Sequence, residues 1–178
     1  MTGAPAGPPG PDVAALVRSL SRASMTVATA ESLTAGAVAA RLADVPGASA
    51  VLRGGVVAYA TDLKRALLGV DGALLAAGGA VQAEVAAQMA AGAAALLGSS
   101  VGVATTGVAG PDTQDGRAVG TVFVAVAGPE RSTALVEEHH VAGDRAAVRS
   151  GAVDAALVLL ARWPGSPGAR ERAGDPGR

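Results

Sequence analysis

The sequence predicts an α/β fold in which a mixed β-sheet is covered by helices on both faces. The chain has 178 residues, of which 50% are hydrophobic, and this is enough for one globular domain with a substantial core. Strand-like and helical patterns alternate in the first half, as in parallel strands joined by crossover helices. Two strand patterns then follow one another late in the chain. This combination predicts a mixed sheet, with ligand sites where strand ends turn into loops.

Each element is predicted from the spacing of apolar residues and from the turn residues that separate them. Helices are expected at residues 13–24, 32–43, 62–70, 82–97 and 144–163. Strands are expected at residues 25–29, 48–60, 101–106, 119–127 and 133–141. Residues 1–11 and 164–178 are rich in Pro, Gly and charge without periodicity, so we expect two disordered tails around a single domain at residues 12–163.

The composition excludes several classes of function. The formal net charge is −1, so no broad attraction to nucleic acid or to an anionic membrane is expected. The chain has no cysteine, which removes disulfides, thiolate metal sites and cysteine nucleophiles. No apolar run reaches the roughly 18 residues of a membrane span, and the first residues lack the pattern of a signal peptide. We therefore expect a cytoplasmic protein that binds neither nucleic acid nor membrane.

Three loop segments carry most of the hydroxyl and titratable side chains. They read "AESLTAG", "YATDLK" and "TTGVAGPDTQDG", and each follows one of the first three predicted strands. In an open α/β sheet, segments that leave such strands can converge at one edge. We therefore expect the ligand site there.

Ser32 lies where the first predicted strand meets the next helix. Its commonest role would be to cap that helix, with Thr34 as the alternative cap. The N-terminus of a helix would also favour an alkoxide or an oxyanion at Ser32. Neither histidine offers a base, because His139 and His140 are adjacent on a predicted strand and point to opposite faces.

Lys64 is the remaining candidate base. It is the only lysine in a chain with thirteen arginines, and a lysine can be deprotonated in a protein whereas an arginine cannot. Chance is the alternative explanation for a single lysine. Tyr59 lies five residues earlier, where its hydroxyl could hold Lys64 or relay a proton, unless it is an ordinary core or rim tyrosine. A serine activated by a lysine is an established catalytic pair.

The glycine-rich segment at residues 106–116 matches neither standard nucleotide-binding fingerprint. It could be simply a long turn, or its N–H groups could bind an anion with charge added by Arg117 or Arg145. Glu31 and Asp112 could form an acid/base pair, although a solvated or capping role is the alternative for each.

Taken together, these segments resemble the CinA C-terminal domain family, which includes stand-alone nicotinamide-nucleotide amidohydrolases. The segment "TAESLTAG" is similar to the family's T-A-E-S-C-T-G-G, and "GGVVAYATDLKRALLGV" is similar to its G-x-x-x-Y-S-N-x-x-K-x-x-L-G-V. The segments "GAVQAEVAAQMA", "TGVAGPD", "VGTVFVAV" and "GDRAAVR" follow in family order, over residues 13–162 in all.

The resemblance implies a three-layer α/β/α sandwich that hydrolyses nicotinamide mononucleotide to nicotinic acid mononucleotide and ammonia, a reaction of NAD recycling, without a metal or redox cofactor. It implies Ser32 as nucleophile, Lys64 as base and Tyr59 as their support, acting through an acyl-enzyme. Glu31 would position the turn or bind substrate. The expected substrate contacts are Glu31, Thr34, Thr106, Gly107, Gly110, Arg117 and Arg145. The expected partners are a small-molecule nucleotide substrate and a second copy of the chain in a dimer.

Three departures from the family motifs affect the pocket more than the proposed chemistry. Leu33 replaces a cysteine, Ala35 replaces the first glycine of a pair, and Ala60 and Thr61 replace Ser-Asn. All three proposed catalytic residues are kept. Two other functions stay open at this point: a catalytically silent nucleotide-binding or regulatory module, and an amidase for a different amide.

Overall fold

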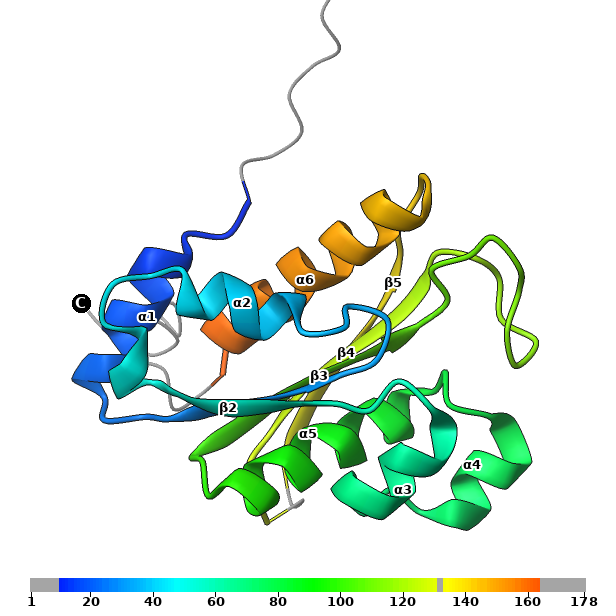
Figure 1. The fold of residues 1–178 in the computed structure, drawn as a ribbon, viewed down its shortest axis with the longest axis horizontal. Helices are drawn as coiled ribbons and strands as arrows, with labels where there is room; N and C mark the ends of the chain where they lie inside the picture. The colour runs from blue at the N-terminus through cyan, green and yellow to red at the C-terminus, as the bar shows by residue number, and fades with distance from the viewer. Residues whose placement is uncertain (1–9, 131–132, 164–178) are drawn as a thin grey trace, which may run out of the picture.

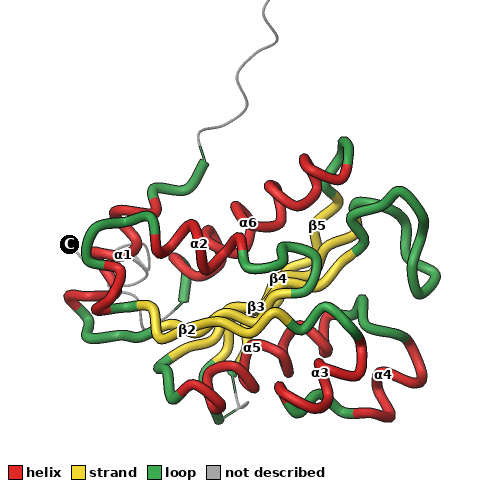
Figure 2. Tube along the Cα trace, in the orientation of Figure 1, coloured by secondary structure: helices red, strands yellow, loops and turns green. Residues whose placement is uncertain are grey.

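The computed structural model describes residues 10–130 and 133–163. A five-stranded sheet with the order β2-β1-β3-β4-β5 lies between two layers of helices (Figure 1, Figure 2). The strands are β1 (Val27–Glu31), β2 (Leu52–Val57), β3 (Val101–Gly107), β4 (Thr121–Ala127) and β5 (Ala134–His140). Strand β1 is parallel to β2 and β3, whereas β4 is antiparallel to β3 and β5. The predicted mixed sheet and three-layer architecture are confirmed.

Helices cover both faces of this sheet (Figure 1). On one face lie α1 (Val13–Arg22), α2 (Ala37–Ala43) and α6 (Arg145–Ala161). On the other lie α3 (Thr61–Leu68), α4 (Gly72–Gly78) and α5 (Ala83–Leu97), and a 3-10 turn, η1 (Ala48–Ala50), leads into β2. None of the helices in the described ranges is long and apolar enough to cross a membrane.

Two hydrophobic clusters hold the layers together, one on each face of the sheet. Beneath α1, α2 and α6, the cluster contains large aliphatic side chains such as Leu20, Leu42 and Leu157. The cluster beneath α5 consists mostly of alanine and valine side chains. The helix α5 comes so close to β3 that a Cβ atom on Gly102 would lie 1.9 Å from the carbonyl oxygen of Ala90. The small residues of α5 and β3 therefore set the thickness of this layer.

The observed elements differ from the predicted ones mainly near the first strand. The helix expected at residues 32–43 begins only at Ala37, because Ala35 (φ 53°) and Gly36 (φ 96°) are in the left-handed region, which ends helical backbone. The strand expected at residues 25–29 lies at Val27–Glu31. The strand expected at residues 48–60 is shorter, at Leu52–Val57, because Ala48–Ala50 form the 3-10 turn η1. Helix α4 was not predicted. The predicted tails fall outside the described residues, apart from residues 10 and 11.

Candidate active site

The candidate site lies at the carboxyl ends of the three parallel strands β2, β1 and β3. Ser32 directly follows β1, and its backbone N–H donates to the carbonyl of Thr105 on β3 at 3.0 Å. Lys64 lies on α3, the helix that follows β2, and the glycine-rich segment follows β3. The structure therefore brings together the three loop segments, as expected for parallel neighbours.

The carboxylate of Glu31, the last residue of β1, holds the turn that follows it. Its Oε2 atom accepts from the N–H groups of Gly36 at 2.9 Å and Val38 at 3.0 Å, and its Oε1 atom accepts from Ala39 at 2.9 Å. The Thr34 hydroxyl also donates to Oε2, at 2.7 Å. Glu31 is 1% exposed. Its carboxylate thus satisfies the first N–H groups of α2, a cap supplied from outside the helix.

This arrangement corrects the expected environment of Ser32. The prediction that a helix N-terminus supports charge on Ser32 is wrong, because α2 begins only at Ala37 and the N–H groups of Gly36, Val38 and Ala39 at its start donate to Glu31. Neither Ser32 nor Thr34 makes a capping hydrogen bond to α2. The Thr34 hydroxyl is buried and also lies 2.7 Å from the hydroxyl of Thr105. It therefore lies on the inner side of the turn.

The amine of Lys64 is held at Ser32 by three hydrogen bonds. Its Nζ atom donates to Ser32 Oγ at 3.2 Å, to the carbonyl of Ala58 at 2.8 Å and to the carbonyl of Tyr59 at 3.1 Å. The Lys64 side chain is 1% exposed. An ammonium group has three donors, so every donor of protonated Lys64 is used and one of them points at Ser32.

Burial lowers the pKa of Lys64 from 10.5 to about 8, and the carboxylates of Asp115 and Asp62 oppose this shift. Desolvation penalises the charged ammonium, whereas nearby negative charge favours it. With a pKa of about 8, about a tenth of the molecules carry a neutral amine at pH 7. Lys64 can therefore act as a base near neutral pH.

A pocket opens beside Ser32. It is lined by Ser32, Leu33, Tyr59, Gly107, Val108, Ala109, Gly110, Asp112, Gln114 and Arg145. Arg145 crosses its mouth, donating to the carbonyl of Gly110 at 2.6 Å and to the hydroxyl of Tyr59 at 2.7 Å. The Tyr59 hydroxyl thus meets Arg145, and it is the Tyr59 backbone carbonyl that holds Lys64. Among the expected substrate contacts, the pocket contains Gly107, Gly110 and Arg145.

Two further expected contacts lie outside the pocket lining. The Thr106 hydroxyl is buried and donates to the carbonyl of Ala80 at 2.8 Å, so this side chain ties β3 to the segment before α5. The guanidinium of Arg117 lies over the ring of Phe123, 5.7 Å from its centroid. A cation and an aromatic face at this distance attract each other. Both side chains therefore have partners within the protein.

Asp112 and Glu31 do not form the acid/base pair considered from the sequence. Asp112 lines the pocket, whereas both oxygens of Glu31 accept hydrogen bonds inside the turn. Asp115 was not predicted as a site residue; its carboxylate accepts from the N–H of Ala80 at 2.7 Å, and its charge raises the pKa of Lys64 against the effect of burial. Asp115 is in an irregular loop, where residue spacing does not indicate partners.

Arg149 on α6 is the other residue at this turn that was not predicted from its sequence. Its Nε and one terminal nitrogen donate to the carbonyls of Leu33 at 2.9 Å and Thr34 at 3.0 Å. Arg149 is separated in the sequence from Leu33 by 116 positions and from Thr34 by 115 positions. The segment "GDRAAVR" matches the family motif and contains Arg149, but the motif does not indicate what the arginine touches.

The described residues contain no group of three or more His, Asp or Glu side chains that could hold a metal ion. His139 and His140 lie on opposite faces of the edge strand β5, as predicted. Each has a glutamate of its own strand nearby: Glu137 is 3.2 Å from His139, and Glu138 is 3.5 Å from His140.

Comparison with known proteins matches residues 12–163 to the CinA C-terminal domain. A CinA-like protein of Frankia casuarinae is 50% identical over 139 residues, which are 78% of this chain and 32% of that protein. A CinA-like protein of Mycolicibacterium gilvum is 47% identical over 140 residues, 79% of this chain and 33% of that protein. The chain thus spans about a third of the length of these relatives.

Solved structures show the same architecture. The competence damage-inducible protein A of Klebsiella pneumoniae superposes with a TM-score of 0.80 at 33% identity, covering 85% of this chain and 94% of that one. The competence/damage inducible protein CihA of Agrobacterium tumefaciens superposes with a TM-score of 0.77 at 34% identity, covering 87% and 97% of the two chains.

Proposed function

The chain belongs to the CinA C-terminal domain family, and from this premise we propose that it is an amidohydrolase that converts nicotinamide mononucleotide to nicotinic acid mononucleotide and ammonia. The proposal assigns the chemistry to Ser32 and Lys64 and the substrate to the pocket beside them. It requires no metal and no redox cofactor. The family resemblance supports the choice of substrate, and the geometry of the two side chains supports the choice of mechanism.

The observation that carries the proposal is the set of partners around the Lys64 amine. When Lys64 loses one proton, it keeps two N–H donors, and the carbonyls of Ala58 and Tyr59 are placed to accept from both. The nitrogen lone pair is then left for the third partner, the hydroxyl of Ser32 at 3.2 Å. The backbone thus orients the neutral amine as an acceptor for the Ser32 proton. The lowered pKa makes that state accessible.

The reaction follows from this starting state. Ser32 Oγ attacks the carboxamide carbon while Lys64 takes the hydroxyl proton, which forms a tetrahedral intermediate. Lys64 then gives that proton to the departing nitrogen, and ammonia leaves an ester on Ser32. Water attacks the ester, Lys64 accepts its proton, and return of that proton to Ser32 Oγ releases the carboxylate product. Lys64 acts as base and acid in turn and ends each cycle as it began.

The pocket supplies groups suited to an anionic nucleotide. Arg145 places a permanent positive charge at the mouth, and the backbone at Gly107 and Gly110 lies beside Ser32. Phosphate is bound in proteins by arginine and by backbone N–H groups of this kind of loop. Tyr59 is 52% exposed, so its ring is free to contact a flat substrate ring. Leu33, at the position where the family motif has a cysteine, also lines the pocket.

Ammonia release from nicotinamide mononucleotide tests the proposal directly. Ser32→Ala should keep the parent's melting curve and lose nearly all activity, because the variant loses only the nucleophile. Ser99→Ala is the matched control: Ser99 is also buried and hydrogen-bonded, to the Val101 carbonyl at 2.9 Å, but lies outside the site. It should keep full activity.

The same assay distinguishes the proposal from its alternatives. Parent protein that binds nicotinamide mononucleotide in calorimetry but releases no ammonia from it would be a nucleotide-binding module. Ammonia released from another amide in a panel, but not from this one, would keep the reaction and replace the substrate. An active Ser32→Ala variant would exclude Ser32 as nucleophile.

A further inference from the structure

The turn that presents Ser32 has an uncommon backbone. It runs from Ser32 to Gly36, and Ala35 adopts a φ of 53° although it has a Cβ atom. A non-glycine residue is uncommon in the left-handed region, because its Cβ atom crowds the following carbonyl oxygen there. Such a conformation persists only where surrounding contacts impose it. The inner side of the turn is held by Glu31, and the question is what holds its outer side.

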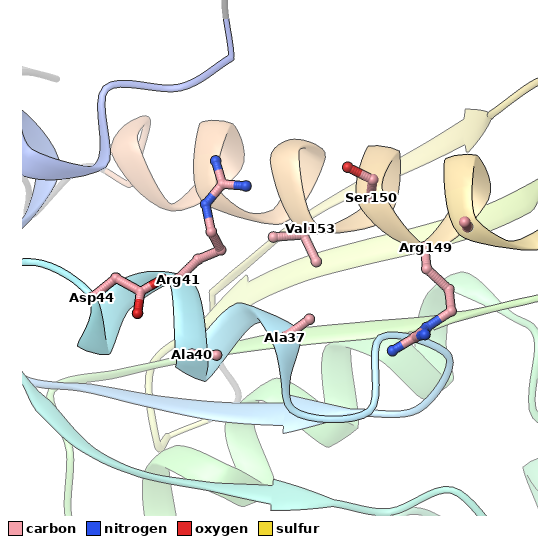
Figure 3. Close-up of a pocket in the computed structure, with 8 residues that line it drawn as sticks. Ala37, Ala40, Arg41, Asp44, Arg149, Ser150 and Val153 are labelled. Atoms are coloured by element: carbon pink, nitrogen blue, oxygen red, sulfur yellow. The ribbon is translucent and has the colours of Figure 1, made fainter.

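Arg149 supplies that outer contact. It projects from the second turn of α6 toward the segment before α2, as Figure 3 shows. The two donating nitrogens meet two successive carbonyls, at 2.9 Å for Leu33 and 3.0 Å for Thr34. A guanidinium has a rigid planar fork of donors, so two such bonds fix both the distance and the orientation of the peptide groups they meet. Lysine could not reproduce this geometry.

The backbone that carries Arg149 is itself fixed. Its neighbour Val148 is 0% exposed and belongs to the core cluster beneath α6. Asp144 caps this helix, accepting from the N–H of Ala147 at 2.9 Å. Arg149 makes no ion pair within the described ranges. Its hydrogen-bonding capacity is therefore directed at the turn and not at a neighbouring carboxylate.

We propose that Arg149 is a positioning residue, which holds the turn through Leu33 and Thr34 so that Ser32 stays within reach of the Lys64 amine. The inference rests on the proposed function for its effect on turnover. A displacement of about 1 Å at a reacting atom can lower a rate about 100-fold. Arg149→Ala should therefore lower kcat about 10- to 100-fold and leave KM within about twofold, because Arg149 does not line the pocket.

The structure also offers a rescue experiment. A groove between α2 and α6 leads to Arg149 from solvent, lined by residues such as Ala37, Arg41, Ser150 and Val153 (Figure 3). In Arg149→Ala, guanidinium chloride or ethylguanidine at millimolar concentration should enter through this groove and restore part of the lost kcat. Ethylammonium, which lacks the planar fork, should restore much less. Arg149→Lys should remain impaired for the same reason.

Arg41→Ala is the control. Arg41 lines the same groove and carries the same charge, but its partner is Asp154 at 3.5 Å on the exposed surface. This variant should keep the parent's kcat and show no response to guanidinium. A kcat for Arg149→Ala within twofold of the parent would overturn the inference, as would a loss that no guanidine restores.

Hydrogen exchange tests the inference without any substrate. The N–H groups of Ala35 and Ala37 donate to the carbonyls of Ser32 and Thr34 within the turn. In Arg149→Ala, peptides covering these amides should exchange at least about tenfold faster than in Arg41→Ala, since a lost tertiary contact favours local opening. Unchanged exchange would overturn the inference even if the parent proves inactive. An inactive parent with faster exchange in Arg149→Ala would overturn only the proposed function.

Discussion

At the scale of single residues, Lys64 is a buried amine that can lose its proton and become neutral. An arginine at this position would keep the charge and could not give it up. We expect Lys64→Arg to lose about 10²- to 10⁴-fold in activity, the range for a positioned acid or base. The parent's rate should rise with pH through the lowered pKa of about 8 and level off above it, since the neutral amine is the active form.

Rates measured across this pH range, beside single rates for Lys64→Arg and Lys64→Ala, check this prediction. Arg65→Lys, an exchange of the same two residue types at an exposed position of the same helix, keeps the charge and should leave the rate unchanged. An arginine variant within a few-fold of the parent would exclude Lys64 as the base. A parent rate that does not change with pH would do the same.

The lowered pKa of Lys64 also predicts how stability depends on pH. Between pH 8 and 10.5 the unfolded chain binds a proton that the folded protein has released. Relative to Lys64→Met, the parent should therefore gain about 2 kcal/mol in free energy of unfolding between about pH 7 and pH 10. Solvent screens this effect little, because Lys64 is buried. Urea unfolding of both proteins at the two pH values measures the difference, and a constant difference would contradict the pKa.

At the scale of elements, the carboxylate of Glu31 caps the N-terminus of α2, although Glu31 lies on the preceding strand. Glu31→Ala would leave three backbone N–H groups and a hydroxyl without their buried acceptor. We expect a loss of at least about 3 kcal/mol in unfolding free energy, since each buried unsatisfied group costs about 1 to 3 kcal/mol.

Asp144→Ala is the matched comparison, because Asp144 caps α6 through one exposed hydrogen bond. That variant should lose only about 1 kcal/mol. Equal losses in the two variants, measured by urea unfolding, would show that Glu31 is no more than an ordinary cap.

The elements that could be predicted from sequence are those with apolar residues at helical spacing, a capping residue or, for α5, a long alanine-rich run. Helices α1, α3 and α6 lie within a few residues of their expected positions because of their apolar spacing and, in α1 and α6, a capping aspartate, and α5 does so because of its alanine-rich composition. The start of α2 could not be predicted, because Ala35 shows no sign of a positive φ in its residue type. Helix α4 was missed because it has seven residues and none that is buried.

At the scale of the whole molecule, the site depends on contacts between segments far apart in the chain. Parallel strand connectivity was enough to predict that Ser32, Lys64 and the glycine-rich segment converge. Individual partners were not predictable: Arg145 meets Tyr59 across 86 positions, and Thr34 meets Thr105 across 71. Such contacts depend on how the helices pack on the sheet, and local spacing carries no information about them.

The burial of Lys64 makes it a chemical reporter of global opening. Since the chain has one lysine, an amine-selective reagent has a single side-chain target, and that target is 1% exposed in the folded protein. Lys64 should therefore be modified only in molecules that have opened, and the modification rate should depend on the population of open molecules. Intact-mass spectrometry would detect the modification of Lys64 as one additional mass increment, after the increment from the α-amino group. This modification should accelerate with urea, and labelling as fast as that of an unfolded peptide would show that the amine is accessible in the native state.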